Sequence, residues 1–375
     1  MLIVCRALAG LGPAAYLPAS IALLGKIYRP GPRKNRVFAL YGAFAPLGFF
    51  FGILFGGITG EYLTWRWYFY LGSIMLGIFC LAGVTTIPND FHRTPPSAIQ
   101  MDWLGVVTVV PGLILLVYAI TDSSQALSGW ASPRIIVTLI LGVGFFCRSC
   151  YVAVKPLLPA ELFRTTGMTP LAVAQFGLYS TFGIFLLYSS FYLELVVGKS
   201  PLVTAVWFLP MIIGGLFIGK VGGLVLHRLH GTVLLCLSGV GTVVCVLLFA
   251  LMPADPNYWA WVMASMIAAT IGIDIAFTVS NVFITTNLPG HQQRLAGAFI
   301  NSLLFLGVSF FSGFGEVAVS HTSHLSRQKN YQVAFWFAVG VSGVSCLILP
   351  FIKIGHAKSE LTVEEREGLE RSERT

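Results

Sequence analysis

The stretch Tyr41–Gly60, YGAFAPLGFFFGILFGGITG, lies in an uncharged run, and its glycines and prolines are Gly42, Pro46, Gly48, Gly52, Gly56, Gly57 and Gly60. A spacing of four residues places the later glycines along one side of a helix and leaves a groove without side chains. In water each interior glycine would cost about 0.5–1 kcal/mol relative to alanine. In hydrocarbon the backbone stays helical, because it has no other hydrogen-bond partner. The stretch therefore predicts a membrane helix with a close helical neighbour, either as simple packing or as part of a functional element.

The composition of the whole chain supports this interpretation. Its 375 residues are 56% hydrophobic and only 10% charged, with 40 glycines and a mean hydropathy of +0.81. Ordinary soluble domains are about 25% charged. We therefore predict an all-α polytopic membrane protein.

Eleven apolar runs are long enough to span a bilayer, which requires about 20 residues. They are 2–25, 37–60, 68–88, 104–121, 134–154, 170–194, 201–226, 232–252, 258–286, 295–317 and 332–352. The run 104–121 is the shortest of them.

The charged connections predict the orientation. The first connection, KIYRPGPRKNR at 26–36, carries five basic residues. Every second connection lies on the same side of the membrane, as does the C-terminal tail, and together they bring the number of basic residues on that side to fifteen. The opposite side holds Arg66, Arg134, Lys199, Arg327 and Lys329. Because basic loops stay in the cytoplasm, the C-terminus is expected inside and Met1 outside. The net charge of +8 then reflects topology, and we expect no nucleic-acid partner.

Two segments near the N-terminus resemble motifs of the major facilitator superfamily. Arg6, followed by Gly10 and Gly12, is similar to the fourth-helix motif. The second run resembles the antiporter motif Gly-x-x-x-Gly-Pro-x-x-Gly-Gly, with glycines at 48, 52, 56 and 57. Ile53 stands where that motif has proline, and Pro46 could supply the bend instead.

Later segments extend the resemblance over nearly the whole chain. DWLGVVTVVPGLILLVYAI at 102–120 resembles the extra helices between the two six-helix halves, and 219–231 resembles a Gly-x-x-x-Asp-Arg loop motif without its acid. Residues 272–302 resemble fungal aminotriazole-resistance-type exporters. This family of drug:proton antiporters has fourteen spans. The resemblance implies that the first run is helix four, so we expect the chain to lack the first three helices.

The resemblance also implies a division of the chain. We expect a remainder of the N-terminal bundle, a cytoplasmic linker, two extra helices, a cytoplasmic loop, a C-terminal six-helix bundle and a charged tail. Their ranges are 1–88, 89–103, 104–154, 155–169, 170–354 and 355–375.

Two intramembrane charges are candidates for proton coupling, since a charge near the bilayer centre is costly and marks function or pairing. Asp274 is the only carboxylate deep in a run, without a basic residue nearby in sequence. Such an acid can take up a proton near neutral pH. The alternative is an acid kept protonated in a helix–helix hydrogen bond. The resemblance implies a role in proton movement for Arg6, which could otherwise reach the outer surface.

Other polar residues carry weaker signals. Asn281 shares a helix face with Asp274, and Gln175, Asn281 and Asn301 could line a cavity, whereas Gln175 and Asn301 could instead lock helices together. Glu194 and Glu316, near outer helix ends, are expected at the interface. No nucleotide-binding loop, zinc pattern or nucleophile motif occurs, so we expect no cofactor, no metal and no enzymatic activity.

These observations predict a secondary-active transporter that exports hydrophobic small molecules in exchange for protons. The alternatives are a uniporter or importer of a small nutrient on the same fold, and a truncated remnant that does not transport. The expected partners are the lipid bilayer, the substrate and protons. We expect a monomer in the plasma membrane rather than the vacuolar membrane.

Overall fold

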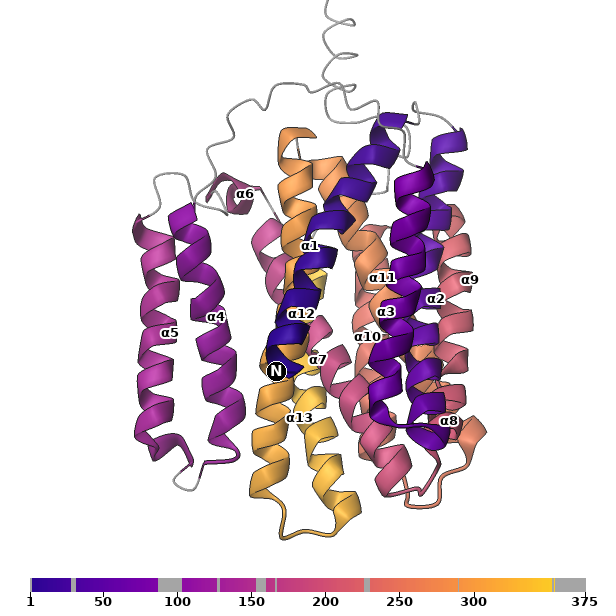
Figure 1. The fold of residues 1–375 in the computed structure, drawn as a ribbon, viewed down its shortest axis with the longest axis vertical. Coiled ribbons are helices and arrows are strands. Elements are labelled where there is room, and N and C mark those ends of the chain that lie inside the picture. The colour runs from indigo at the N-terminus through magenta and orange to yellow at the C-terminus, as the bar shows by residue number, and fades with distance from the viewer. Residues whose placement is uncertain are drawn as a thin grey trace, which may run out of the picture.

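The computed structural model describes residues 2–27, 32–86, 103–126, 129–152, 160–165, 167–225, 230–288, 290–352 and 354. Within these ranges the chain is helical and contains no strand. Figure 1 shows the long helices side by side along the long axis. The linker 89–102, residues 226–229 of the loop motif and the tail 355–375 lie outside the described residues.

The helices follow the predicted runs. They are α1 (Leu2–Ile27), α2 (Pro32–Tyr62), α3 (Trp65–Thr86), α4 (Trp103–Ser123), α5 (Pro133–Val152), α6 (Ala160–Arg164), α7 (Met168–Leu195), α8 (Pro201–Trp207), α9 (Leu209–Val225), α10 (Gly231–Ala250), α11 (Ala264–Asn287), α12 (Gly290–His321) and α13 (Arg327–Ile348). Short 3-10 turns occupy Gly129–Ala131 (η1) and Leu349–Phe351 (η3), and a π-helical turn at Tyr258–Met263 (η2) leads into α11.

One predicted run is divided. The run 201–226 forms α8 and α9, which are separated at Phe208. Pro210 has no N–H to donate to the preceding turn, so the α-helical ladder is interrupted there. The Phe208 N–H donates to the carbonyl oxygen of Ala205 at 3.2 Å instead.

The membrane character predicted from composition is confirmed. Eight described helical stretches, from Trp65–Thr86 to Arg327–Phe351, are long and apolar enough to cross a membrane. Leu2–Tyr16 of α1 and Leu47–Tyr62 of α2 are shorter apolar helical stretches. The chain is therefore an all-α, multi-pass membrane protein.

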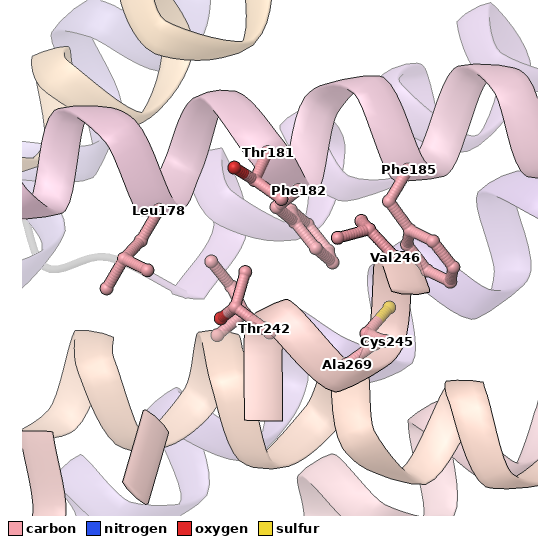
Figure 2. A pocket seen from close by; sticks show the side chains of 9 residues that line it. Leu178, Thr181, Phe182, Phe185, Thr242, Cys245, Val246 and Ala269 are labelled. Carbon is pink, nitrogen blue, oxygen red and sulfur yellow. The ribbon is translucent and has the colours of Figure 1, made fainter. Parts of the chain in front are cut away.

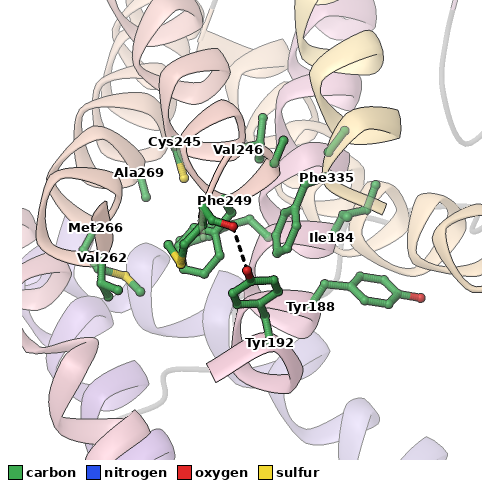
Figure 3. Close-up of a cluster of buried hydrophobic side chains, with 14 of the residues drawn as sticks. Ile184, Tyr188, Tyr192, Cys245, Val246, Phe249, Val262, Met266, Ala269 and Phe335 are labelled. Carbon is green, nitrogen blue, oxygen red and sulfur yellow. Dashed lines mark hydrogen bonds between the residues drawn. The ribbon is translucent and has the colours of Figure 1, made fainter. Parts of the chain in front are cut away.

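The most extensive packing lies among α7 and α9 to α13. Their buried side chains form two clusters, one toward each end of α7. In Figure 3, the ring of Tyr192 packs against Phe249 and Phe335, and its hydroxyl donates to the carbonyl oxygen of Met252 at 2.8 Å. This bundle is the framework on which the candidate site is built.

The first three helices make fewer contacts with the C-terminal bundle than its own helices make with one another. α2 packs against α8 and α9, whereas α3 packs on α2 and has no buried residue. α4 pairs with α5 and also packs against α12. Contact between the N-terminal helices and the C-terminal bundle is thus concentrated on α2.

The connections gather at two ends of the molecule. The turns α2–α3, α4–α5, α7–α8, α10–η2 and α12–α13 lie at the lower end in Figure 1. Four of these five turns hold or adjoin the residues predicted for the outer side, which are Arg66, Arg134, Lys199, Arg327 and Lys329. The lower end is therefore the one predicted to face outward.

Candidate functional site

Asp274 lies on the side of α11 that faces away from α10, and its side chain is half-buried. α10 approaches α11 at Gly272, where the Thr242 backbone nitrogen is 3.1 Å from the position that a Cβ would take. Two residues further along a helix point about 200° around its axis, so Asp274 faces away from α10. Ile267 and Phe277 lie on the same stripe, with 43% and 38% of their surface exposed.

The carboxylate of Asp274 has no partner among the residues that the structure describes. The Thr278 hydroxyl donates to the Asp274 backbone oxygen at 2.6 Å, which leaves the side chain unengaged. Asn281 lies two turns further along the stripe, and its amide donates to the Phe277 carbonyl oxygen at 2.9 Å. The stripe therefore combines a carboxylate, an amide and apolar surface.

Gln175 locks two helices together. This α7 side chain is fully buried, and its amide nitrogen donates to the Ala276 carbonyl oxygen at 2.9 Å and to the Ser280 hydroxyl. Both partners belong to α11. Of the two roles that the sequence left open, the contacts are those of a helix–helix lock.

Replacing Gln175 by alanine is expected to lower the free energy of unfolding by about 1–3 kcal/mol, because the hydrogen bonds from α7 to α11 are lost and the buried side chain leaves a cavity. Asn301→Ala is the matched control. Asn301 is exposed on α12, and its amide donates to the Gly297 carbonyl oxygen of the same helix. Thermal unfolding of the detergent-purified protein measures both. Equal melting temperatures for the two variants would contradict the lock.

Arg6 lies on an exposed face of α1, with its guanidinium carbon 4.7 Å from the centre of the Phe69 ring of α3. A cation over an aromatic face is attracted by the ring quadrupole. The start of α1 lies part-way along the height of the bundle in Figure 1. The observed partner of Arg6 is thus an aromatic ring, and no described contact joins it to Asp274.

The glycines of α2 meet two different neighbours. Positions for a Cβ at Gly52 and Gly56 lie 4.0 and 3.9 Å from the Tyr68 side chain of α3, and at Gly48 no atom lies within 4 Å. At Gly57 the Pro201 carbonyl oxygen is 2.9 Å away and the Leu202 Cα 3.1 Å away. The close backbone approach is therefore at Gly57 and not along the ladder, because nine residues place Gly48 about 180° from Gly57.

The rest of this interface follows the face of Gly57. Ile53, one turn earlier, packs against the buried cluster of the C-terminal bundle. Glu61, one turn later, accepts a hydrogen bond from the Leu202 backbone N–H at 3.1 Å. The isoleucine in place of the motif's proline thus serves as a packing contact. Gly42 and Pro46 also lie on α2, but their surroundings are outside the described part of the chain.

The cavity found among the described residues of the C-terminal bundle is too small for a substrate. Figure 2 shows a cavity among α7, α10 and α11, lined by Thr181, Phe185, Thr242 and Cys245 among others. Its volume is about 10 Å³, which is close to the minimum for one water molecule. Sites for drug-sized molecules have about 300–1,000 Å³. The Asp274 stripe, with its exposed Ile267 and Phe277, is a candidate face for a substrate.

Comparison with known proteins places these features in context. The family model described as Major Facilitator Superfamily matches residues 1–312 and, in a second match, residues 201–373. A low affinity ammonium transporter of Saccharomyces cerevisiae is 30% identical over 357 residues, which are 92% of this chain and 68% of that protein.

Two further relatives have names that refer to efflux or resistance. The efflux pump terJ of Aspergillus terreus is 28% identical over 371 residues, covering 96% of this chain and 71% of that protein. The aminotriazole resistance protein of Saccharomyces cerevisiae is 30% identical over 365 residues, covering 92% and 65%.

Proposed function

Because the chain belongs to the Major Facilitator Superfamily, we propose that it exports hydrophobic small molecules across a membrane in exchange for protons. The family is one of membrane transporters, and the apolar helices make this chain a multi-pass membrane protein. Export, proton coupling and the fourteen-span drug:proton antiporter subfamily are the proposed parts. The relatives named as an efflux pump and a resistance protein support the direction of transport.

The position of Asp274 is the observation that carries the proposal. A carboxylate that neither pairs with a cation nor locks a helix can exchange protons with water and respond to substrate. It lies on a stripe with exposed Ile267 and Phe277, which suits a substrate with apolar surface. Proton and substrate would then compete for one face of α11.

The contact at Gly57 suits the movement that such transport requires. Carriers of this fold alternate access by rocking one helix bundle against the other. Here α2 touches α8 at the lower end of the molecule, where Glu61 accepts the Leu202 N–H. In the proposed cycle this end opens when α2 and α8 separate, and it closes again when Gly57 returns to Pro201.

A carrier for a small nutrient is the second candidate. It is favoured by one relative, the low affinity ammonium transporter. Under this alternative Asp274 would attract a small cation, and apolar substrates would not be moved.

Transport by inside-out vesicles from cells that express the chain distinguishes the two functions. We expect an imposed proton gradient, acidic inside, to drive uptake of ethidium, puromycin or aminotriazole above that of vesicles without the chain. Ammonium movement without uptake of these three compounds would favour the nutrient carrier. If neither moves in vesicles that contain the folded chain, the export proposal is wrong and a non-transporting protein is favoured.

A further inference from the structure

The segment Gly313-Phe314-Gly315-Glu316 of α12 joins three helices at one carboxylate. Two residues along a helix point about 200° around its axis, so Gly313 and Gly315 open α12 on nearly opposite sides. A different neighbour occupies each opening. From the sequence alone, Glu316 is predicted only to lie at the membrane interface.

The α4–α5 hairpin occupies the side of Gly313. The position of a Cβ at Gly313 lies 2.9 Å from the Thr121 hydroxyl oxygen and 3.1 Å from the Ile120 methyl carbon Cγ2. Ile120 and Ser123 are buried, although they lie at the end of α4. A side chain at Gly313 would therefore meet the Thr121 and Ile120 side chains, so α12 and α4 are in direct contact here.

α7 occupies the side of Gly315. The Tyr188 ring lies 3.0 Å from the position of a Cβ there, and its hydroxyl donates to the Oε2 of Glu316 at 3.1 Å. The other oxygen of the carboxylate, Oε1, accepts from the Gln125 amide at 3.5 Å. Gln125 follows α4, so the two oxygens of Glu316 hold α7 and the hairpin, respectively.

The hairpin is itself a tight pair. A Cβ at Gly112 of α4 would lie 3.2 Å from the Gly142 carbonyl oxygen of α5, and one at Gly142 would lie 3.1 Å from the Leu116 nitrogen. Backbones this close have little freedom to slide. Whatever holds α4 therefore also positions α5.

We propose that the α4–α5 hairpin moves with the C-terminal bundle, and that Glu316 is the positioning residue that holds it there. The proposed movement of the hairpin rests on the proposed transport function, whereas its attachment to α12 does not. In the transport cycle the contact of Thr121 with Gly313 persists, and the contact of Gly57 with Ala205 breaks.

Two cysteine pairs test the movement. In Thr121→Cys with Gly313→Cys, the hydroxyl position at 2.9 Å brings the two Cβ atoms to the separation of about 3.5–4.5 Å found in disulfides. Gly60→Cys with Pro201→Cys is the matched pair at the α2–α8 contact, because the Pro201 Cβ is 3.6 Å from a Cβ at Gly60. Copper phenanthroline oxidises each thiol pair to a disulfide. A protease site inserted at 155–158 lies between the two cysteines of each pair. After cleavage, the two fragments of the chain stay joined in the absence of reductant only if the disulfide has formed.

We expect the vesicles with linked Thr121 and Gly313 to keep their transport rate, and those with linked Gly60 and Pro201 to lose transport until a reductant is added. Arrest by the first link, reversed by reduction, would overturn the joint movement while leaving the proposed function intact. A chain that moves no substrate even when reduced would contradict the proposed function. In that case the attachment of the α4–α5 hairpin to α12 is still tested by the rate at which the Thr121–Gly313 disulfide forms, because that measurement does not require transport.

The rate at which the Thr121–Gly313 disulfide forms in membranes tests the role of Glu316. Glu316→Ala is expected to slow formation of the Thr121–Gly313 disulfide severalfold, and Glu316→Gln, which keeps an oxygen acceptor, is expected to restore most of it. Glu194→Ala, at the end of α7, is the control and should leave the rate unchanged. An unchanged rate in Glu316→Ala, or failure of the pair to cross-link in the folded chain, would overturn the proposal.

Discussion

Substitution of Asp274 by asparagine is expected to reduce proton-driven efflux to the background of vesicles that lack the chain. Asparagine has nearly the shape of aspartate but cannot bind and release a proton. The structure gives the carboxylate no partner among the described residues, so its removal breaks no described contact. We therefore expect normal amounts of folded protein and a loss confined to transport.

Two further substitutions make this prediction specific. Asp274→Glu keeps an acid on the stripe and is expected to retain part of the activity. Asp122→Asn, at the end of α4, makes the same chemical change away from the stripe and should leave efflux unchanged. Full pH-driven efflux by Asp274→Asn would remove Asp274 from the mechanism.

Substitution of Gly57 by alanine is expected to shift the carrier away from the state in which α2 touches α8. The added methyl group would lie 2.9 Å from the Pro201 oxygen and 3.1 Å from the Leu202 Cα. Both are backbone atoms, so they cannot rotate away as a side chain could. Overpacking of this kind costs about 1–3 kcal/mol, which corresponds to a change of about 5- to 150-fold between two states.

Labelling at the lower end of the molecule measures this shift. A cysteine at Glu61 should react faster with a membrane-impermeant maleimide when Gly57 is alanine, because α2 and α8 spend more time apart. Gly48→Ala is the matched control on the same helix, since no atom lies within 4 Å of its Cβ position. Equal labelling rates in the two variants would contradict the assignment of Gly57 as the point of contact.

The helices could be predicted from the sequence because their length and apolar composition are local properties. Within the described residues each of the eleven runs is helical, although the run 201–226 forms two helices. The side of a helix that contacts a given neighbour is not a local property of the sequence. Four-residue spacing identified glycines at 48, 52 and 56, but contact with α8 depends on the rotation of α2 about its axis, and that rotation favours Gly57.

The polar residues follow the same distinction. Asp274 could be selected from sequence as a lone intramembrane acid, whereas its side of α11 became clear only from the close approach of α10 at Gly272. The sequence gives no sign of the partners of Gln175 and Glu316. Ala276 lies 101 residues from Gln175, and Gln125 lies 191 residues from Glu316. Contacts over such separations are set by tertiary packing.

The most direct test of proton-coupled export is proton movement itself. Inside-out vesicles are acidified internally, and ethidium is added while a pH-sensitive dye reports the internal pH. We expect ethidium to dissipate the gradient in vesicles with the native chain and not in those with Asp274→Asn. Uptake of ethidium by the native chain without any proton movement would contradict it.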